Sequence, residues 1–268
     1  MAFIQCDFFS EALGMSTSIN VLLPQKTRSQ IGLEGTVGEG KFPVLWLLHG
    51  RSDDHTIWMR RTSIERYVAP LGIAVVMPFA NVSFYHNMAH GAAYEDYIEE
   101  ELPEVARSFF PLSDRREDNF VAGLSMGGYG AMKMALNHPE RYAAAASLSG
   151  ALDAAAFVND PEPARIQWMK QIFGETGYLN IAGGHADLFS KMEQLQKKGV
   201  DLPKLFACCG AQDFLLEHNH AFVAKAKSLG IPLDYIENEG THEWGYWDQM
   251  IQTVLNWLPI HLSDRDEA

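Results

Sequence analysis

Short runs of apolar residues alternate along the chain with segments in which apolar residues recur every three or four positions. The short runs predict buried strands, and the spaced segments predict amphipathic helices that bury one face. Strands are expected at 18–24, 43–50, 73–79, 119–125, 143–150, 204–210 and 232–238. Helices are expected over 93–110, 126–137 and about 244–258. This alternation predicts an α/β fold with a mostly parallel central sheet and helices on both faces.

Several segments refine this picture. Pro103 falls inside the 93–110 pattern and predicts a kink there or two separate helices. The first two predicted strands are hairpin-like and are expected to be antiparallel, with the Gly-rich stretch 31–41 as a surface loop. Residues 151–203 are longer than a simple crossover, so we expect a mainly helical insertion that caps a pocket. No linker separates this insertion, and we expect a single domain over residues 1–268.

The segment Gly-Leu-Ser-Met-Gly at 123–127 follows a predicted buried strand and opens a predicted helix. In the pattern G-x-S-x-G the serine occupies a tight, strained strand-to-helix turn, and the flanking glycines remove side chains that would clash. The N-terminus of the following helix favours the negative oxygen that develops during acyl transfer. We therefore interpret Ser125 as a nucleophile and not as part of a Gly-rich turn without a chemical role.

A serine hydroxyl is a poor nucleophile unless a base takes its proton. His242 lies directly after the last predicted strand and before the last predicted helix, where a loop can carry a catalytic base. Asp213 lies just past the strand at 204–210 and is the candidate acid that orients His242, whereas Asp248 falls on the last predicted helix. The order Ser, Asp, His along the chain is the order found in the α/β-hydrolase fold.

Two backbone N–H groups are expected to form the oxyanion hole. One belongs to Met126, the residue after the nucleophile. The other is expected in the loop after strand 43–50, at Arg51 or alternatively Gly50. His49 precedes this loop, and we interpret it as a residue that shapes the loop and not as the catalytic base.

Two further sets of residues are candidates for a binding role. Trp168, in the predicted insertion, and Trp244, beside the predicted base, are candidates for lining the substrate pocket. His86 and His90 are four residues apart, a spacing that can bind a metal on a helix. Their segment looks like a loop without an evident third ligand, so neither a metal nor a cofactor is expected.

Composition narrows the range of partners and compartments. The chain has 34 Asp and Glu against 21 Lys and Arg, a net charge of −13 that would repel nucleic acid and anionic lipid. No apolar run approaches the roughly 18 residues of a membrane span, and residues 1–15 do not resemble a secretory signal. Cys208 and Cys209 are adjacent in an apolar run and are expected to be buried, reduced thiols. These features predict a cytoplasmic protein without a nucleic-acid or membrane partner, and they leave neutral substrates open.

Taken together, these stretches resemble the tributyrin esterase branch of the esterase D-like α/β-hydrolases. The resemblance is carried by FFSEALGMSTSINVLLP, PVLWLLHG, AGLSMGGYGAMKMAL, SLSGAL, CGAQDFL and GTHEWGYWDQMI, which span nearly the whole chain. It implies hydrolysis of carboxylic esters with short acyl groups, no cofactor, and frequent assembly into homo-oligomers. By motif, the resemblance assigns Ser125 as nucleophile, Asp213 as acid and His242 as base. Arg51 stands where the family commonly has an apolar residue, and its guanidinium could bind an anionic group of the substrate.

Three hypotheses of function follow. The first is a serine carboxylesterase that acts on small acylated substrates through an acyl-enzyme intermediate. The second keeps the same triad but changes the leaving group or the acceptor, as in an S-formylglutathione hydrolase-type thioesterase or an acyltransferase. The third is a non-catalytic binding protein with this fold. Such proteins usually lose a triad residue, whereas all three candidates are present here.

Overall fold

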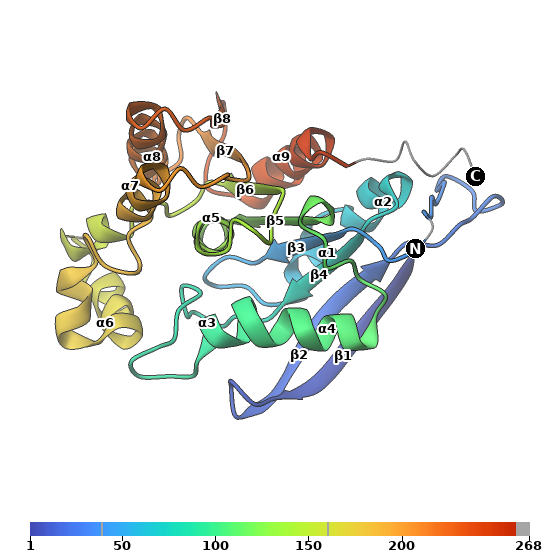
Figure 1. The fold of residues 1–268 in the computed structure, drawn as a ribbon, viewed down its shortest axis with the longest axis horizontal. Helices are drawn as coiled ribbons and strands as arrows, with labels where there is room; N and C mark the ends of the chain where they lie inside the picture. The colour runs from blue at the N-terminus through green and yellow to red at the C-terminus, as the bar shows by residue number, and fades with distance from the viewer. Residues whose placement is uncertain (39, 160, 261–268) are drawn as a thin grey trace.

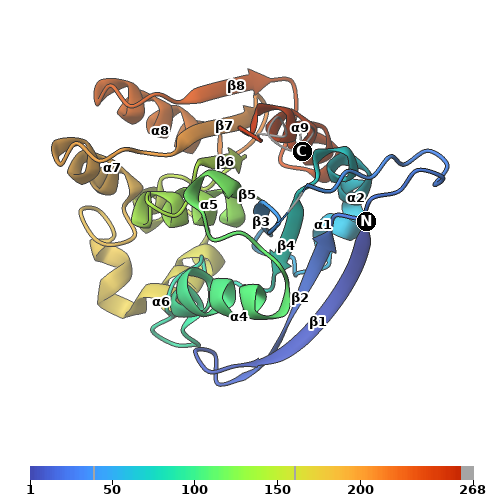
Figure 2. The same cartoon turned by 45° about the vertical axis from the view of Figure 1, so that its right-hand side comes forward.

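Figures 1 and 2 show the fold in a computed structural model that describes residues 1–38, 40–159 and 161–260. Within these residues, eight strands form one sheet in the order β1-β2-β4-β3-β5-β6-β7-β8. The strands are β1 Ala2–Ser10, β2 Met15–Leu23, β3 Val44–Leu48, β4 Ala74–Pro78, β5 Asn119–Leu124, β6 Ala144–Leu148, β7 Lys204–Gly210 and β8 Asp234–Asn238. The strands from β4 to β8 in this order pair in parallel, whereas β2 is antiparallel to both of its neighbours. The expected α/β-hydrolase fold is confirmed.

Both faces of the sheet are buried because helices cover each of them. Alternate residues of β3 point into two different cores: Val44 and Leu48 belong to one, and Leu45 and Leu47 belong to the other. The first core is closed by α4, α5, α7 and α8, and the second by α1, α2 and α9. In both views the central strands β5 and β3 lie between α5 and the pair α1 and α2. Burial on both faces explains why β3 to β6 read as continuous apolar runs.

The helices follow the predicted pattern closely. Helical structure over 94–109 includes a π-helical turn, Tyr97–Glu101, just before Pro103, so the expected irregularity is confirmed. No helix in the described part of the chain is long and apolar enough to cross a membrane. The helices are α1 Ile57–Arg61, α2 Ile64–Val68, α3 Tyr94–Asp96, α4 Leu102–Phe109, α5 Met126–Asn137, α6 Pro163–Gly177, α7 Leu188–Lys197, α8 Leu216–Ser228 and α9 Trp244–Trp257.

One expectation about the strands is wrong. The strands predicted at 18–24 and 43–50 are not an antiparallel hairpin, because β2 pairs with β1 and β4 while β3 lies between β4 and β5. The hairpin partner of β2 is β1, a strand that the sequence patterns do not single out. The long connection over residues 24–43 gives β3 the freedom to enter the sheet beyond β4. Residues 151–203 are mainly helical, as expected, with α6 and α7 as their long helices.

Candidate active site

Ser125 lies at the turn between β5 and α5 in a strained backbone conformation. Its φ of 53° and ψ of −117° are unusual for a residue with a side chain. The two neighbouring glycines make this turn possible: a Cβ on Gly123 would lie 2.3 Å from the carbonyl oxygen of Gly127. A Cβ on Gly127 would in turn lie 2.6 Å from the carbonyl oxygens of Leu48 and His49. The sharp turn presents the Ser125 hydroxyl at the carboxyl end of the sheet.

The structure brings Ser125, His242 and Asp213 into one chain of hydrogen bonds. The Ser125 Oγ lies 3.0 Å from Nε2 of His242. On the other side of the ring, Nδ1 of His242 lies 2.9 Å from Oδ2 and 3.0 Å from Oδ1 of Asp213. A neutral imidazole that donates Nδ1–H to the carboxylate presents an Nε2 lone pair to the hydroxyl. This tautomer can accept the Ser125 proton.

Two loops that follow β7 and β8 bring Asp213 and His242 together. Asp213 follows β7, and His242 lies between β8 and α9. The loops touch at two glycines, because a Cβ on Gly210 would lie 2.3 Å from the carbonyl oxygen of Gly240. This close approach, between neighbouring parallel strands, lets side chains far apart in the sequence meet.

The carboxylate of Asp213 is held in its charged form although its side chain is fully buried. Burial alone would raise the pKa of Asp213. Hydrogen bonds from His242, from the backbone N–H of Leu215 and from Ser149 outweigh burial and hold this pKa below its usual value. Ser149 is a residue that the sequence analysis missed, and its Oγ also accepts a hydrogen bond from Trp247 at 3.1 Å. Ser149 could have been identified from its position directly after β6, the strand that neighbours β5 in the sheet.

The loop after β3 lies against Ser125. A Cβ on Gly50 would be 3.6 Å from the Cβ of Ser125, so the backbone of this loop is immediately beside the hydroxyl. Neither Arg51 nor Met126 uses its backbone N–H in a hydrogen bond to another residue of the described ranges. Met126 begins α5, where the first backbone N–H groups lack helical acceptors. These two groups are therefore available to an oxygen bound at the site.

His49 supports this loop, and both of its ring nitrogens form hydrogen bonds with the backbone. Its Nδ1 lies 2.7 Å from the carbonyl oxygen of Gly50, and its Nε2 accepts the backbone N–H of Ala80 at 2.9 Å. Burial lowers the pKa of His49 to about 4, so the ring is neutral near pH 7. Because both ring nitrogens are occupied, His49 cannot take the proton of Ser125.

A small cavity of about 100 Å³ opens beside Ser125. The predicted pocket residue Trp168 lies in its wall, and the guanidinium of Arg51 lies 4.4 Å above that indole ring. The sequence analysis missed Arg165, which contributes a second guanidinium to the same wall. The lining residues are Arg51, Phe84, Ser125, Met126, Ala151, Phe157, Arg165, Trp168, Phe214 and Leu215. Aromatic side chains therefore form much of the cavity, with positive charge at its edge.

Trp244 does not line this cavity, in contrast to the expectation. Its ring packs edge-on against Trp58 and Trp247 at centroid distances of 5.2 and 5.3 Å. Trp244 is the first residue of α9, and it packs against the core on the face of the sheet that α1 and α2 cover. The ring that contacts His242 from this helix is instead Trp247, edge-on at 4.8 Å.

His86 and His90 do not share a helix, because both lie in the loop between β4 and α3. His86 is buried and contacts Glu95 and Tyr129, and its ring lies 5.9 Å from that of His185. The two histidines that meet are therefore His86 and His185, which are far apart in the sequence.

Comparison with known proteins places this site in a family. A family model described as "Putative esterase" matches residues 10–258. The chain belongs to this esterase family. Among curated relatives, the esterase is 28% identical to the acetyl esterase of Caldicellulosiruptor saccharolyticus over 264 residues, 96% of this chain and 98% of the relative. It is 33% identical to the S-formylglutathione hydrolase of Paracoccus denitrificans over 156 residues, 50% of this chain and 51% of the relative.

Two solved structures from Staphylococcus aureus are similar to the esterase over nearly the whole chain. FphF, a fluorophosphonate-binding serine hydrolase solved with bound substrate, has a TM-score of 0.85 and 35% identity. The apoenzyme of the S-formylglutathione hydrolase FrmB has a TM-score of 0.82 and 34% identity. Each comparison covers 96% of the esterase and 98% of the solved chain. The esterase is a serine hydrolase that cleaves carboxylic esters.

Proposed function

We propose that the esterase hydrolyses short-chain acyl esters through an acyl-enzyme intermediate on Ser125. The observation that carries this proposal is the chain of hydrogen bonds from Ser125 through His242 to Asp213, at 3.0 and 2.9 Å, beside a small apolar cavity. In this proposal His242 is the general base, and Asp213 orients the ring and stabilises its charged form. The backbone N–H groups of Arg51 and Met126 form the oxyanion hole.

The proposed reaction has two half-reactions. In the first, Ser125 Oγ attacks the acyl carbon as its proton moves to Nε2 of His242, and the carbonyl π electrons move onto oxygen. The tetrahedral intermediate then collapses, breaking the bond to the alcohol oxygen, which takes the proton from His242. In the second half-reaction, water attacks the acyl-enzyme and gives a proton to His242. Collapse then releases the carboxylic acid, and the proton returns to Ser125.

The size and walls of the cavity support the preference for short acyl groups. Its volume of about 100 Å³ equals roughly three water molecules in the liquid, which suits an acetyl or butyryl group. Phe157, Arg165 and Trp168 come from residues 151–203, which supports the proposal that this segment caps the site. The similarity to an acetyl esterase and the tributyrin-esterase motifs support the same preference.

The decisive test removes the proposed nucleophile. Ser125→Ala should lower kcat by about a millionfold on p-nitrophenyl butyrate, the scale observed when a triad serine is lost. The variant should also fail to react with a fluorophosphonate probe. Ser108→Ala, on an exposed turn of α4, is the matched control and should behave as wild type. A labelled, active Ser125→Ala enzyme would refute the proposal. Among p-nitrophenyl esters of increasing chain length, kcat/KM should be highest for acetyl or butyryl.

A second candidate function is thioester hydrolysis of the S-formylglutathione type. The two guanidinium groups in the cavity wall favour it, because glutathione carries carboxylates that they could bind. Similarity to proteins named S-formylglutathione hydrolase supports the same candidate. A higher kcat/KM for S-formylglutathione than for p-nitrophenyl acetate would favour the thioester, and the reverse ratio would favour the ester.

We further propose that the esterase forms homo-oligomers and works in the cytoplasm. The resemblance to the tributyrin esterases is the basis for the first proposal. The edge strand β1 supports the proposal of a homo-oligomer, because it leaves two large apolar side chains exposed: Phe3 is 44% exposed and Phe9 is 56% exposed. The second proposal, the cytoplasmic location, is supported by the unpaired thiols of Cys6, Cys208 and Cys209, which are typical of a reducing compartment. Light scattering coupled to size-exclusion chromatography would measure the oligomeric state, and a monomer at micromolar concentration would contradict the first proposal.

A further inference from the structure

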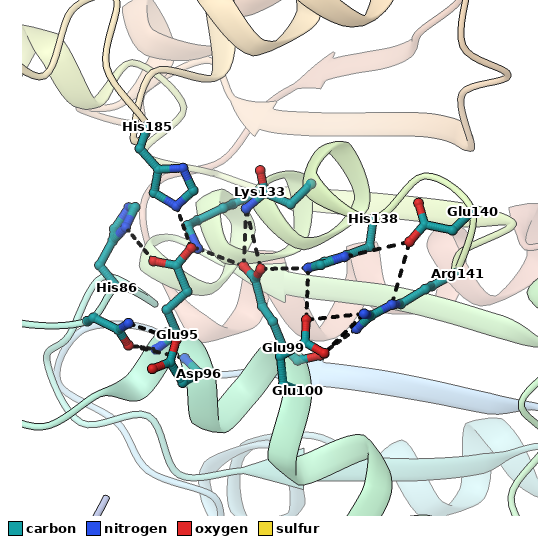
Figure 3. A network of polar contacts seen from close by, with 12 residues as sticks. His86, Glu95, Asp96, Glu99, Glu100, Lys133, His138, Glu140, Arg141 and His185 are labelled. Atoms are coloured by element: carbon teal, nitrogen blue, oxygen red, sulfur yellow. Dashed lines mark hydrogen bonds and ion pairs between the residues drawn. The ribbon is translucent and has the colours of Figure 1, made fainter. Parts of the chain in front are cut away.

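A second cluster of polar side chains lies outside the cavity that contains Ser125. His86, Glu95 and His185 each offer one ligand atom, and these atoms all lie within 4.8 Å of one another. Figure 3 shows the three side chains converging from three parts of the chain: the loop after β4, helix α3 and the loop before α7. All three also line the wall of a cavity of about 540 Å³, which gives water access to the cluster.

The hydrogen bonds around His86 set its tautomer. The hydroxyl of Tyr129 donates its single proton to the carbonyl oxygen of Ala186 at 2.8 Å. The contact of 2.8 Å between that hydroxyl and Nε2 of His86 therefore requires Nε2–H to be the donor. In the neutral ring, this bond places the single ring proton on Nε2. Its Nδ1 then carries a lone pair and no proton.

This lone pair points at another acceptor. Nδ1 of His86 lies 3.3 Å from Oε2 of Glu95, a carboxylate oxygen that also has no proton to donate. A cation bound by both acceptors would turn this repulsive contact into an attractive one. A tetrahedral zinc ion bound at about 2 Å holds its ligand atoms about 3.3 Å apart, which matches this contact. A buried histidine that donates its other N–H to a fixed oxygen is the usual partner arrangement of a zinc ligand.

Lys133 already contacts Glu95, but it does not neutralise the cluster alone. Its buried ammonium lies 2.8 Å from Oε1 of Glu95 and 2.6 Å from Oε1 of Glu99. One lysine is thus shared between two carboxylates, as Figure 3 shows, and an excess negative charge remains when the histidines are neutral. Oε1 of Glu95 also lies 2.5 Å from Nε2 of His185, so the carboxylate faces both histidines.

We propose that His86, Glu95 and His185 bind one divalent transition-metal ion, with zinc as the best match. Two imidazole nitrogens and one carboxylate oxygen are donors that favour zinc over magnesium or calcium. A water molecule from the adjoining cavity completes the coordination. None of the three ligands lines the cavity at Ser125. The ion therefore has a structural role: it ties the 151–203 segment, through His185, to the loop after β4 and to α3. This inference is independent of the proposed ester hydrolysis.

The test is zinc binding to enzyme stripped of metal with a chelator, measured by isothermal titration calorimetry. Wild type should bind one equivalent. His185→Ala should bind at least about 100-fold more weakly, since even loss of a residue that supports a ligand costs about 10–100-fold. His185 is exposed, so the variant should fold normally, which circular dichroism would verify. His220→Ala is the matched control, because His220 is also exposed and pairs with a glutamate, at 2.6 Å from Glu237.

A second variant tests the tautomer argument. Tyr129→Phe removes the oxygen that accepts Nε2–H of His86 and should weaken zinc binding about 10–100-fold. Zinc should also raise the melting temperature of wild type and His220→Ala but not of His185→Ala. The proposal is overturned if wild type binds no zinc, or if His185→Ala binds it as tightly as wild type. Labelling of Ser125 by a fluorophosphonate should be the same with and without zinc, which separates this test from that of the proposed reaction.

Discussion

At the scale of single residues, the site depends on how the backbone holds Ser125. The residue occupies a conformation with positive φ that a side chain disfavours, and buried neighbours on β3, β5 and α5 hold it there. In this conformation the hydroxyl lies 3.0 Å from Nε2 of His242, the preorganised arrangement that the proposed reaction requires. Removal of a partner of His242 should therefore affect the reaction more than the fold.

Asp213→Asn tests the orientation of the base. The amide can donate a proton to Nδ1 of His242 and favour the wrong tautomer, so kcat should fall roughly ten-thousandfold. Asp248→Asn is the control, because Asp248 lies on α9 and accepts a hydrogen bond from Tyr67 at 2.9 Å instead of contacting the base. Steady-state kinetics on p-nitrophenyl butyrate would measure both variants. If Asp248→Asn caused the larger loss, the assignment of the acid would be incorrect.

Arg51→Ala separates the backbone of the loop from its side chain. Burial, and then the nearby charge of Arg165, lower the pKa of Arg51, so the two guanidinium groups repel each other and together attract an anion. The variant keeps the backbone N–H, and kcat on a neutral ester should be largely retained. For an ester that carries a carboxylate, KM should rise roughly tenfold or more, the loss of one charge-assisted hydrogen bond.

The control for this prediction is Arg66→Ala. Arg66 stacks on Tyr67 on α2 and does not line the cavity, so both substrates should keep their wild-type KM. A large loss of kcat on the neutral ester in Arg51→Ala, with the structure intact, would show that the side chain takes part in bond cleavage.

At the scale of elements, a buried ion pair joins the helical segment 94–109 to α5. The π-helical turn carries Glu99, whose carboxylate meets Lys133 of α5 at 2.6 Å and His138 at 2.9 Å. The side chains of Glu99 and Lys133 are only 6% and 1% exposed, so solvent screens this pair little. Burial raises the pKa of Glu99, but the hydrogen bond with His138 and the charge of Lys133 outweigh it and hold the pKa below its usual value.

Glu99→Gln should lower the free energy of unfolding by about 1–3 kcal/mol at pH 7, since Glu95 is then the one charged partner that Lys133 keeps among the residues the structure describes. A carboxyl whose pKa is lowered by folding stabilises the protein above its unfolded pKa, about 4.3 for glutamate. That stabilisation is lost as pH falls from there through the folded pKa. The difference between wild type and variant should therefore shrink below about pH 4.3. Urea unfolding at several pH values would measure it.

Glu100→Gln is the control for this element, because Glu100 follows Glu99 directly but its side chain is 55% exposed. Its effect should stay within about 0.5 kcal/mol at every pH, as is usual for a surface substitution. An equal effect of the two substitutions, or a difference that grows toward acid pH, would contradict the role given to Glu99.

At the scale of the whole molecule, the order of the strands assembles the site. Because β5, β6, β7 and β8 are consecutive parallel neighbours, the loops at their carboxyl ends lie side by side. Ser125, Ser149, Asp213 and His242 occupy these four loops in order. Residues 151–203 leave the sheet between β6 and β7 and return Trp168 and Arg165 to the cavity beside Ser125. The small cavity thus lies between loops that follow the strands on one side and α6 on the other.

Some of this architecture is determined by local sequence alone. The alternation of apolar runs and helical spacing predicts β2 to β8 and the helices α4, α5 and α9, because the burial of each element depends on its own periodicity. The turn at Ser125 is also local, since the clash between positions 123 and 127 arises within five residues. The candidates Asp213 and His242 follow from the ends of predicted strands, which short-range pattern can locate.

The tertiary structure alone decided which elements become neighbours. The pairing of β2 with β1 and β4, and not with β3, depends on a long connection whose path no local pattern encodes. Trp168 faces the cavity and Trp244 the core because the packing of α6 and α9 sets their orientation. The cluster joins His86 and Glu95, nine residues apart, to His185, which lies 90 residues beyond Glu95, so no local spacing in the sequence could reveal it. Contacts between distant residues depend on sheet order and helix packing, and only the folded chain determines these.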